Sequence, residues 1–177
     1  MKIQIYGYSG SGKSTLAHDL GAKLGLPVLH MDTVHFLPGW QVREMDEKRR
    51  MVETFMKNDD WVIDGNHTNL FYRERMEQAD RIIFMNFNRL TCLRRVLRRY
   101  LENRGRSRAS MAEGCNEKID AEFIRWVLWG SRTRRARRRN ADIAREYAHK
   151  TTILRNQREL DAFRQQMEIA FQNERGV

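Results

Sequence analysis

The sequence predicts an α/β three-layer sandwich, in which helices cover both faces of a parallel sheet. Short apolar segments alternate with amphipathic helical segments along the chain, and the links between them are short. A chain of 177 residues with 41% hydrophobic residues is sufficient for one hydrophobic core. We therefore expect a single domain over residues 1–177, with no internal repeat.

Five segments have the composition of buried strands: residues 2–6, 28–31, 61–64, 81–87 and 151–154. Helical patterns cover residues 13–24, 45–58, 70–78, 90–103 and 120–149, and a last helix ends near Phe171. Residues 32–40 include Pro38 and Gly39, so we expect a loop without regular structure there. The polar, glycine-containing stretch 104–118 predicts a mobile lid.

Composition excludes several classes of protein. With 32% charged residues and two prolines, the chain is neither a disordered protein nor a disulfide scaffold. No apolar run is long enough to span a bilayer, and glycines interrupt the N-terminus before a signal-peptide core can form. We expect a cytoplasmic enzyme that does not contact membranes.

The cysteines and histidines do not form a metal-binding pattern. Cys92 and Cys115 lack the paired spacing of zinc or redox motifs, which predicts two free thiols. The five histidines are dispersed, and none forms the helical HExxH arrangement.

The positive charge is concentrated in one part of the chain. Residues 89–139 contain fifteen arginines and one lysine but only five acidic residues, so they account for the whole net charge of +10. Such a block indicates an anionic partner or a solvated helix face. A disordered basic tail is the weaker interpretation, because apolar residues such as Trp126 and Trp129 interleave with the arginines.

The segment GYSGSGKS, residues 7–14, matches the P-loop pattern GxxxxGK[ST]. It follows a predicted strand and begins a predicted helix, as phosphate binding by backbone amides requires. We predict that ATP is bound by Gly7, Ser9, Gly10, Ser11, Gly12, Lys13, Ser14 and Thr15. Lys13 supplies a positive charge to the β- and γ-phosphates, and the Ser14 hydroxyl is a ligand for Mg²⁺. The alternative is a glycine-serine turn at a helix start.

Asp64 ends an apolar strand in the segment WVIDGN. An acid at this position can hold a magnesium-bound water near Ser14, as the Walker B aspartate does. The alternative is an aspartate that only caps a turn.

At this point the sequence resembles a known family. WVIDGN resembles the FLLDGFP stretch of adenylate kinases, and RRVLRR is similar to the arginine pair that precedes their lid. Six segments in order resemble the bacterial DNA topology modulation protein family, which is adenylate-kinase-related: GYSGSGKSTLA, LHMDTVHFLPGW, WVIDGNHTN, FNRLTCLRRVLRRYL, MAEGC and FIRWVLW.

This resemblance implies a P-loop NTPase of the nucleoside-monophosphate-kinase type, with five parallel strands in the order 2-3-1-4-5. It also implies that Asp32, at the end of the second strand, faces a phosphoryl acceptor together with His35 and Trp40. The related shikimate kinases carry two acids in this region, whereas His30 occupies the first place here. The expected catalytic residues are Lys13, Asp32, Arg95, Arg99, Arg132 and Arg135.

Several functions fit these residues. The first hypothesis is a kinase that transfers the γ-phosphate of ATP, with Mg²⁺, to a small-molecule or nucleotide acceptor. The alternatives are a nucleic-acid-binding ATPase and a polynucleotide kinase, for which the basic segment would bind phosphates of DNA or RNA. The sequence leaves the acceptor and the oligomeric state open.

Overall fold

A computed structural model describes residues 1–103, 110–111, 114–115 and 119–174. The predicted lid at 104–118 therefore lies largely outside the described residues. The first half of the chain forms β1 (Lys2–Gly7), α1 (Lys13–Leu24), β2 (Val28–His30), α2 (Met31–His35), β3 (Phe36–Leu37), η1 (Pro38–Trp40), β4 (Gln41–Val42), α3 (Met45–Met56), β5 (Trp61–Asp64), α4 (Tyr72–Gln78) and β6 (Arg81–Met85). The second half forms α5 (Arg89–Asn103), α6 (Ala121–Leu128), η2 (Gly130–Arg132), α7 (Arg134–Glu146), η3 (Ala148–Lys150), β7 (Thr151–Leu154) and α8 (Gln157–Glu174).

The main sheet has five parallel strands in the order β2-β5-β1-β6-β7. Numbered by their succession along the chain, these strands have the order 2-3-1-4-5, which confirms the predicted fold class. The P-loop strand β1 is central, between β5 and β6. Because the strands are parallel, the segments that follow them lie at the same end of the sheet, where the carboxyl ends of the strands are.

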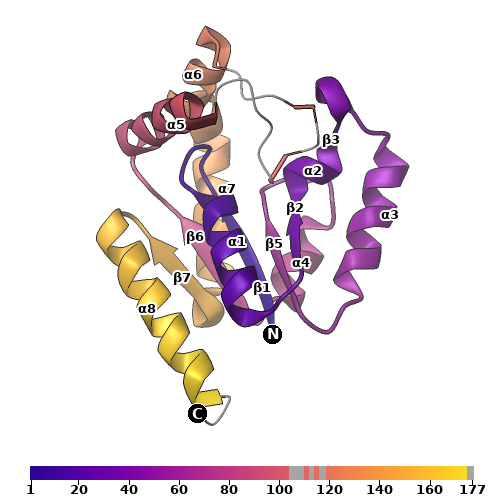
Figure 1. Cartoon of the computed structure of the whole chain (residues 1–177), viewed down its shortest axis with the longest axis vertical. Helices are drawn as coiled ribbons and strands as arrows, with labels where there is room; N and C mark the ends of the chain where they lie inside the picture. The colour runs from indigo at the N-terminus through magenta and orange to yellow at the C-terminus, as the bar shows by residue number, and fades with distance from the viewer. Residues whose placement is uncertain (104–109, 112–113, 116–118, 175–177) are drawn as a thin grey trace.

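Helices cover both faces of this sheet (Figure 1). Alternate residues of β1 point to opposite faces, as the period of a strand requires. Ile3 and Ile5 pack with apolar residues of α1 and α8, whereas Tyr6 packs with residues of α3, α4 and α7. The predicted three-layer sandwich is thus present.

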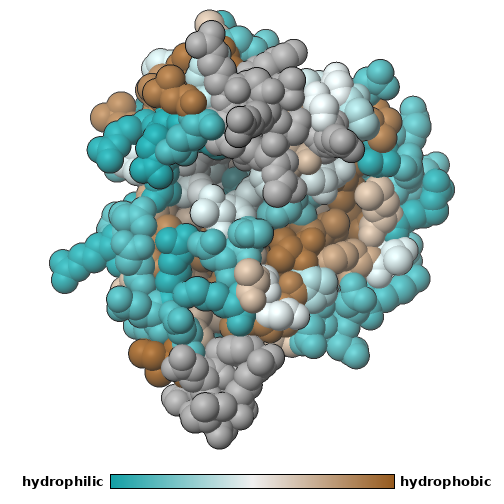
Figure 2. All heavy atoms as spheres, in the orientation of Figure 1, coloured by the Kyte–Doolittle hydropathy of each residue, from teal (hydrophilic) through white to brown (hydrophobic). Residues whose placement is uncertain are grey.

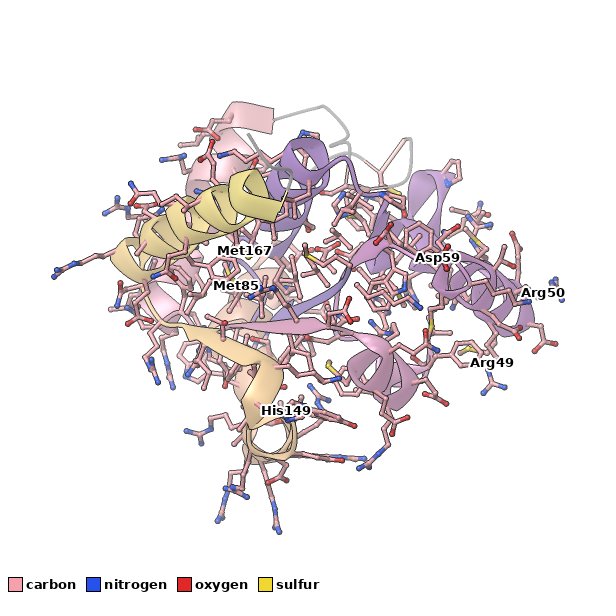
Figure 3. The ribbon with its side chains drawn as sticks, turned by 90° about the horizontal axis from the view of Figure 1, so that it is seen from below. Arg49, Arg50, Asp59, Met85, His149 and Met167 are labelled. Atoms are coloured by element: carbon pink, nitrogen blue, oxygen red, sulfur yellow. The ribbon has the colours of Figure 1, made fainter. Side chains whose placement is uncertain are left out.

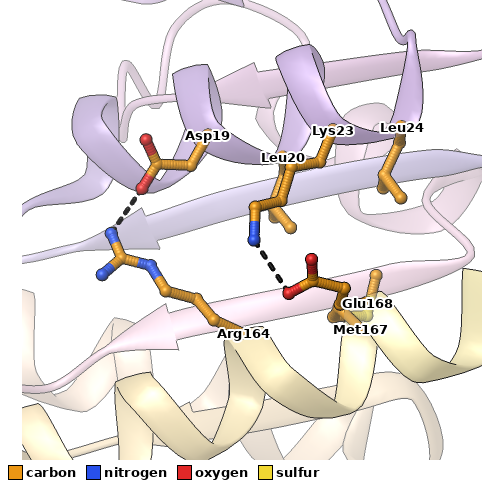
Figure 4. A pocket seen from close by; sticks show the side chains of 7 residues that line it. All are labelled: Asp19, Leu20, Lys23, Leu24, Arg164, Met167 and Glu168. Carbon is orange, nitrogen blue, oxygen red and sulfur yellow. Dashed lines mark hydrogen bonds and ion pairs between the residues drawn. The ribbon is translucent and has the colours of Figure 1, made fainter.

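Two ion pairs connect α8 to α1, next to the apolar cluster that contains Ile3 and Ile5 (Figure 4). Asp19 lies 2.5 Å from the Arg164 guanidinium, and Lys23 lies 3.0 Å from Glu168. The groove between the two helices is lined by these four side chains and by apolar residues such as Leu20. Met85 at the end of β6 belongs to the same core as Met167 of α8 (Figure 3).

The expectation of an irregular loop at 32–40 is wrong. Met31 and Val34 are both buried, and this spacing of three residues lets α2 pack against the core. The chain then forms a small antiparallel hairpin, in which Phe36 pairs with Val42. Pro38 and Gly39 lie in the connection of this hairpin, so they do not exclude regular structure on either side.

The expectation of one long helix over 120–149 is also wrong. Gly130 lies against the ring of Trp126, where an added Cβ would be 2.5 Å from a ring carbon, and η2 begins there. Thr133 then caps a new helix, because its hydroxyl accepts a hydrogen bond from the Ala136 amide at 3.2 Å. After this break, Arg132 of η2 lies against the ring of Tyr8 in the P-loop, whereas Arg139 of α7 lies near the ring of Tyr72.

The visible surface is mostly hydrophilic (Figure 2). Hydrophobic side chains gather between α1 and α3, near β2 at the edge of the sheet (Figure 2). Arg49 and Arg50 of α3 are exposed and point away from the body of the molecule (Figure 3). In the part of the chain that the structure describes, every helix is too short or too polar to cross a membrane.

Candidate functional site

The loop from Gly7 to Ser14 connects β1 to α1 and has a backbone that favours glycine. Gly10 has a φ of +76°, and an added Cβ there would lie 2.7 Å from the Cys92 carbonyl oxygen of α5. Gly12 has a φ of +95° and precedes α1 without a side-chain cap. The first amides of α1 are therefore left for an anion, which the helix dipole also favours.

The other predicted ATP-binding residues lie in this loop and at the start of α1. Lys13 donates a hydrogen bond from Nζ to the Tyr8 carbonyl oxygen at 3.2 Å, so its ammonium group lies across the loop. Ser11 is fully buried, and its hydroxyl has no hydrogen-bond partner among the described residues. Ser9 is half-buried, and Thr15 is exposed on the first turn of α1.

Ser14 and Asp64 meet at the start of α1. The Ser14 hydroxyl donates to Asp64 Oδ2 at 2.7 Å, although the two residues are 50 positions apart. The second carboxylate oxygen lies 2.6 Å from His30 Nδ1, and both side chains are largely buried. A hydroxyl and a carboxylate are oxygen ligands of the kind that Mg²⁺ prefers.

The described residues of the site supply few ligands for a metal ion. No group of three or more histidine, cysteine or acidic residues within the described part of the chain could hold a metal. Mg²⁺ usually keeps several waters and is bound by one or two carboxylates together with substrate phosphates. The Ser14–Asp64 pair fits that mode of binding.

Two of the predicted arginines lie at the P-loop. Arg95 of α5 donates to the Ser11 carbonyl oxygen and, at 2.5 Å, to Gln157 Oε1 at the start of α8. Its guanidinium carbon lies 4.0 Å from the centre of the Phe87 ring. Burial lowers the pKa of Arg95, but an arginine remains charged near neutral pH.

Arg132 reaches the loop from η2. Its guanidinium carbon is 3.8 Å from the centre of the Tyr8 ring, and Nη2 donates to the Phe87 carbonyl oxygen at 2.7 Å. The same nitrogen lies 3.2 Å from the sulfur of Cys92, a buried free cysteine whose thiol pKa is raised by burial. Arg95 and Arg132 therefore bring positive charge to the P-loop from two directions.

The other two predicted arginines lie on α5 and α7. Arg99 is half-buried on α5, one helical turn beyond Arg95. Arg135 is exposed on α7.

The predicted acceptor residues form a second cluster. Asp32 is in the first turn of α2 and not at the end of β2, because the strand already ends at His30. Its Oδ1 lies 3.2 Å from Nε2 of His67, and the ring of His67 is 5.2 Å from that of His35. The structure thus brings Asp32 and His35 together through a histidine that sequence reasoning missed.

Trp40 joins this cluster indirectly. Its ring packs edge-on against Phe36 at 5.1 Å, and Phe36 in turn packs against His35 at 4.6 Å. Burial and then the neighbouring charges of His67 and Lys48 lower the pKa of His35, so its ring is neutral near neutral pH. This cluster is therefore lined by aromatic rings and carries the exposed carboxylate of Asp32.

Sequence reasoning also missed His30 and Asn66. Asn66 pairs with the backbone of Gly7 through both atoms of its amide. Its position directly after the Asp-Gly pair of WVIDGN was the available signal. In the sequence, His30 stands out only because it occupies a place where shikimate kinases carry an acidic residue. Its contact with Asp64 depends on the pairing of β2 with β5.

Comparisons with known proteins agree with this fold. The family profile AAA_18, described as an AAA domain, matches residues 3–125. A shikimate kinase from Acinetobacter baumannii in complex with shikimate superposes with a TM-score of 0.58 at 18% identity, covering 97% of this chain and 93% of that chain. A shikimate kinase from Bacteroides thetaiotaomicron gives 0.54 at 19% identity, with coverage of 97% and 98%. A comparison with curated proteins gave no significant match.

At these identities the two enzymes show the fold, which is that of P-loop kinases. The profile covers more than half of the chain and includes the P-loop, Asp64 and Arg95. The chain belongs to the AAA domain family that this profile describes.

Proposed function

We propose that the protein is an ATP-dependent phosphotransferase that transfers the γ-phosphate, with Mg²⁺, to a small-molecule or nucleotide acceptor. The observation that carries this proposal is the 2.7 Å hydrogen bond between Ser14 and Asp64 at the end of the P-loop. Kinases of this fold place a hydroxyl and an acid there to hold the metal beside the β- and γ-phosphates. A glycine-serine turn without that function would not need a buried carboxylate.

In this proposal the P-loop amides and Lys13 hold the phosphates of ATP. Ser14 would hold Mg²⁺ directly and Asp64 partly through water, and the ion would neutralise charge on the β- and γ-oxygens. Arg95 and Arg132 would stabilise the charge that develops on the transferred group, since both already lie at the loop. Arg99 on α5 and Arg135 on α7 are further candidates for the same role.

Asp32, His35 and Trp40 would bind the acceptor. The exposed Asp32 carboxylate can orient an acceptor hydroxyl or take its proton. The shikimate kinase with bound shikimate makes a hydroxyl-bearing small molecule a reasonable class to test. His30 is held by Asp64 and thus belongs to the metal side of the site.

The resemblance to the DNA topology modulation protein family supports a second candidate, a nucleic-acid-binding ATPase or polynucleotide kinase. One observation favours it: α7 exposes a row of arginines, namely Arg134, Arg135, Arg137 and Arg138. Binding through several phosphates should weaken by about 10³-fold or more between low and moderate salt. A filter-binding or anisotropy assay over that salt range decides between the candidates.

The test of the first proposal is a screen of ATP turnover against nucleosides, nucleotides, sugars and shikimate-like acids. ATP with Mg²⁺ should also raise the melting temperature of the protein. Lys13→Ala should remove this shift, whereas Lys23→Ala, at the other end of α1, should keep it. A shift that survives in Lys13→Ala would refute the P-loop assignment.

A single domain over residues 1–177 and a cytoplasmic location remain part of this proposal. The composition of the chain and its likeness in fold to a shikimate kinase support both parts.

A further inference from the structure

The three residues that follow β5, Gly65, Asn66 and His67, contact both halves of the candidate site. On the nucleotide side, Asn66 Nδ2 donates to the Gly7 carbonyl oxygen at 2.9 Å. The Gly7 amide donates back to Asn66 Oδ1 at 3.1 Å. One side chain thus satisfies both backbone groups of the first P-loop glycine and fixes its peptide planes.

On the acceptor side, the next residue holds Asp32. His67 Nε2 lies 3.2 Å from Asp32 Oδ1, and the His67 ring is tilted against that of His35. The His67 side chain is 19% exposed and that of Asp32 is 51% exposed. His67 therefore limits the positions that the exposed Asp32 carboxylate can take.

A buried cation fixes the three residues in one conformation. Arg75 of α4 is fully buried and donates to the carbonyl oxygens of Gly65, Asn66 and His67 at 3.1 to 3.3 Å. Burial lowers the pKa of Arg75 to about 10, so the group stays charged near neutral pH. A buried charge without such contacts would be strongly unfavourable, and any shift of the segment would remove several of them together.

Close packing adds a second constraint. Gly65 has a φ of +129°, and an added Cβ would lie 2.6 Å from Cβ of Met31 at the start of α2. The segment therefore lies against α2, which carries Asp32 and His35. A displacement of the P-loop that is transmitted through Asn66 reaches His67, and with it the contact to Asp32, over one peptide bond.

We propose that Asn66 and His67 are positioning residues that couple nucleotide binding at the P-loop to the arrangement of Asp32 on the acceptor side. This inference rests on the proposed function, because it takes residues 7–15 as the nucleotide site. Asn66 acts on Gly7, His67 acts on Asp32, and Arg75 makes the two move as one unit. ATP bound at the P-loop thereby prepares the acceptor side for the second substrate.

The test compares Asn66→Ala with Asn69→Ala. Asn69 is exposed, and its amide lies 3.9 Å from the sulfur of Met45. Asn69→Ala therefore makes the same substitution, asparagine to alanine, at a residue whose amide contacts Met45 instead of the P-loop. Calorimetry measures the affinity for ATP with Mg²⁺, and nitrogen NMR of the imidazole follows His67. We expect Asn66→Ala to weaken ATP binding about tenfold, since two hydrogen bonds that hold Gly7 are lost. Asn69→Ala should bind ATP as the parent protein does.

The NMR signal separates coupling from a general loss of structure. In the parent protein and in Asn69→Ala, saturating ATP with Mg²⁺ should shift the His67 ring resonance. In Asn66→Ala, the resonance should not respond even when ATP is saturating. If Asn66→Ala does not fold, Asn66→Asp replaces it, because its carboxylate still accepts from the Gly7 amide and lacks only the donor to the Gly7 carbonyl.

Two results would overturn the inference while the proposed function stands: equal ATP affinity in Asn66→Ala, or a His67 response that persists in it at saturation. A parent protein that does not bind ATP with Mg²⁺ would overturn the proposed function and the inference with it.

Discussion

Replacement of Asp64 by asparagine removes one charge from the candidate metal site and keeps the shape of the side chain. Asp64 accepts from Ser14 at 2.7 Å and contacts His30 Nδ1 at 2.6 Å through its other oxygen. An asparagine can keep both contacts if its oxygen faces Ser14 and its amide group faces a His30 that has no proton on Nδ1. The variant should therefore fold.

The magnitudes follow from this geometry. A hydrogen bond to a charged group contributes about 1.5–3 kcal/mol and a neutral one about 0.5–1.5 kcal/mol. A neutral amide costs less free energy to bury than a carboxylate, which offsets part of that difference. We therefore expect the free energy of unfolding to fall by no more than about 2 kcal/mol. Loss of a group that orients a metal or its ligands weakens metal affinity by about 10- to 100-fold.

Two measurements check this prediction. Background ATP hydrolysis is titrated with Mg²⁺ at fixed ATP, where Asp64→Asn should shift the midpoint to higher metal concentration. Binding of metal-free ATP is measured with a chelator present and should be retained, because the P-loop amides and Lys13 are intact. An unchanged magnesium midpoint in a folded Asp64→Asn, or the same shift in Asp32→Asn, would show that Asp64 does not serve the metal.

Three other substitutions test the remaining parts of the site and the fold. Asp32→Asn should leave ATP affinity and background hydrolysis unchanged but lower transfer to the true acceptor by about 10²- to 10⁴-fold in steady-state assays; loss of ATP binding would contradict this role. Arg132→Ala should lower the transfer rate by about 10²-fold with little change in ATP affinity, and an unchanged rate constant would remove Arg132 from the catalytic residues. Since burial lowers the pKa of His35, the folded protein binds fewer protons than the unfolded chain below about pH 6.5, and its free energy of unfolding falls as the pH falls through that window. His35→Gln should flatten this dependence in urea titrations at about pH 7 and about pH 5, and an equal slope would exclude His35 as its source.

Much of the fold was predictable because each strand is a short apolar segment next to a clear helical pattern. Trp61–Asp64 and Thr151–Leu154 were placed at the right residues, since both are bounded by polar turns. Helix α2 was not predicted, because its two buried residues Met31 and Val34 are recognised only through their packing on the core, and the break at η2 was not predicted either. From the sequence alone, Gly130 is compatible with a continuous helix. In the structure the ring of Trp126 fills the space where a Cβ of residue 130 would lie.

The site was predictable where a local motif carries the chemistry. Gly7 to Ser14 form the expected loop between β1 and α1, and Asp64 lies beside Ser14 as its position at a strand end suggested. Arg75 gave no local signal, because it lies in a polar helical segment that reads as a solvated face. Its full burial follows only from where α4 crosses the loop after β5.

The position of β1 in the middle of the sheet has a consequence for biosynthesis. β1 is synthesised before both of its neighbours in the sheet and before α1 and α8, which cover Ile3 and Ile5. Leu160, Phe163 and Met167 of α8 complete that core, so a nascent chain that stops before α8 presents an uncovered apolar sheet face. Such a chain is prone to aggregation and is a target for chaperones and proteases until α8 has been synthesised and has packed on the sheet.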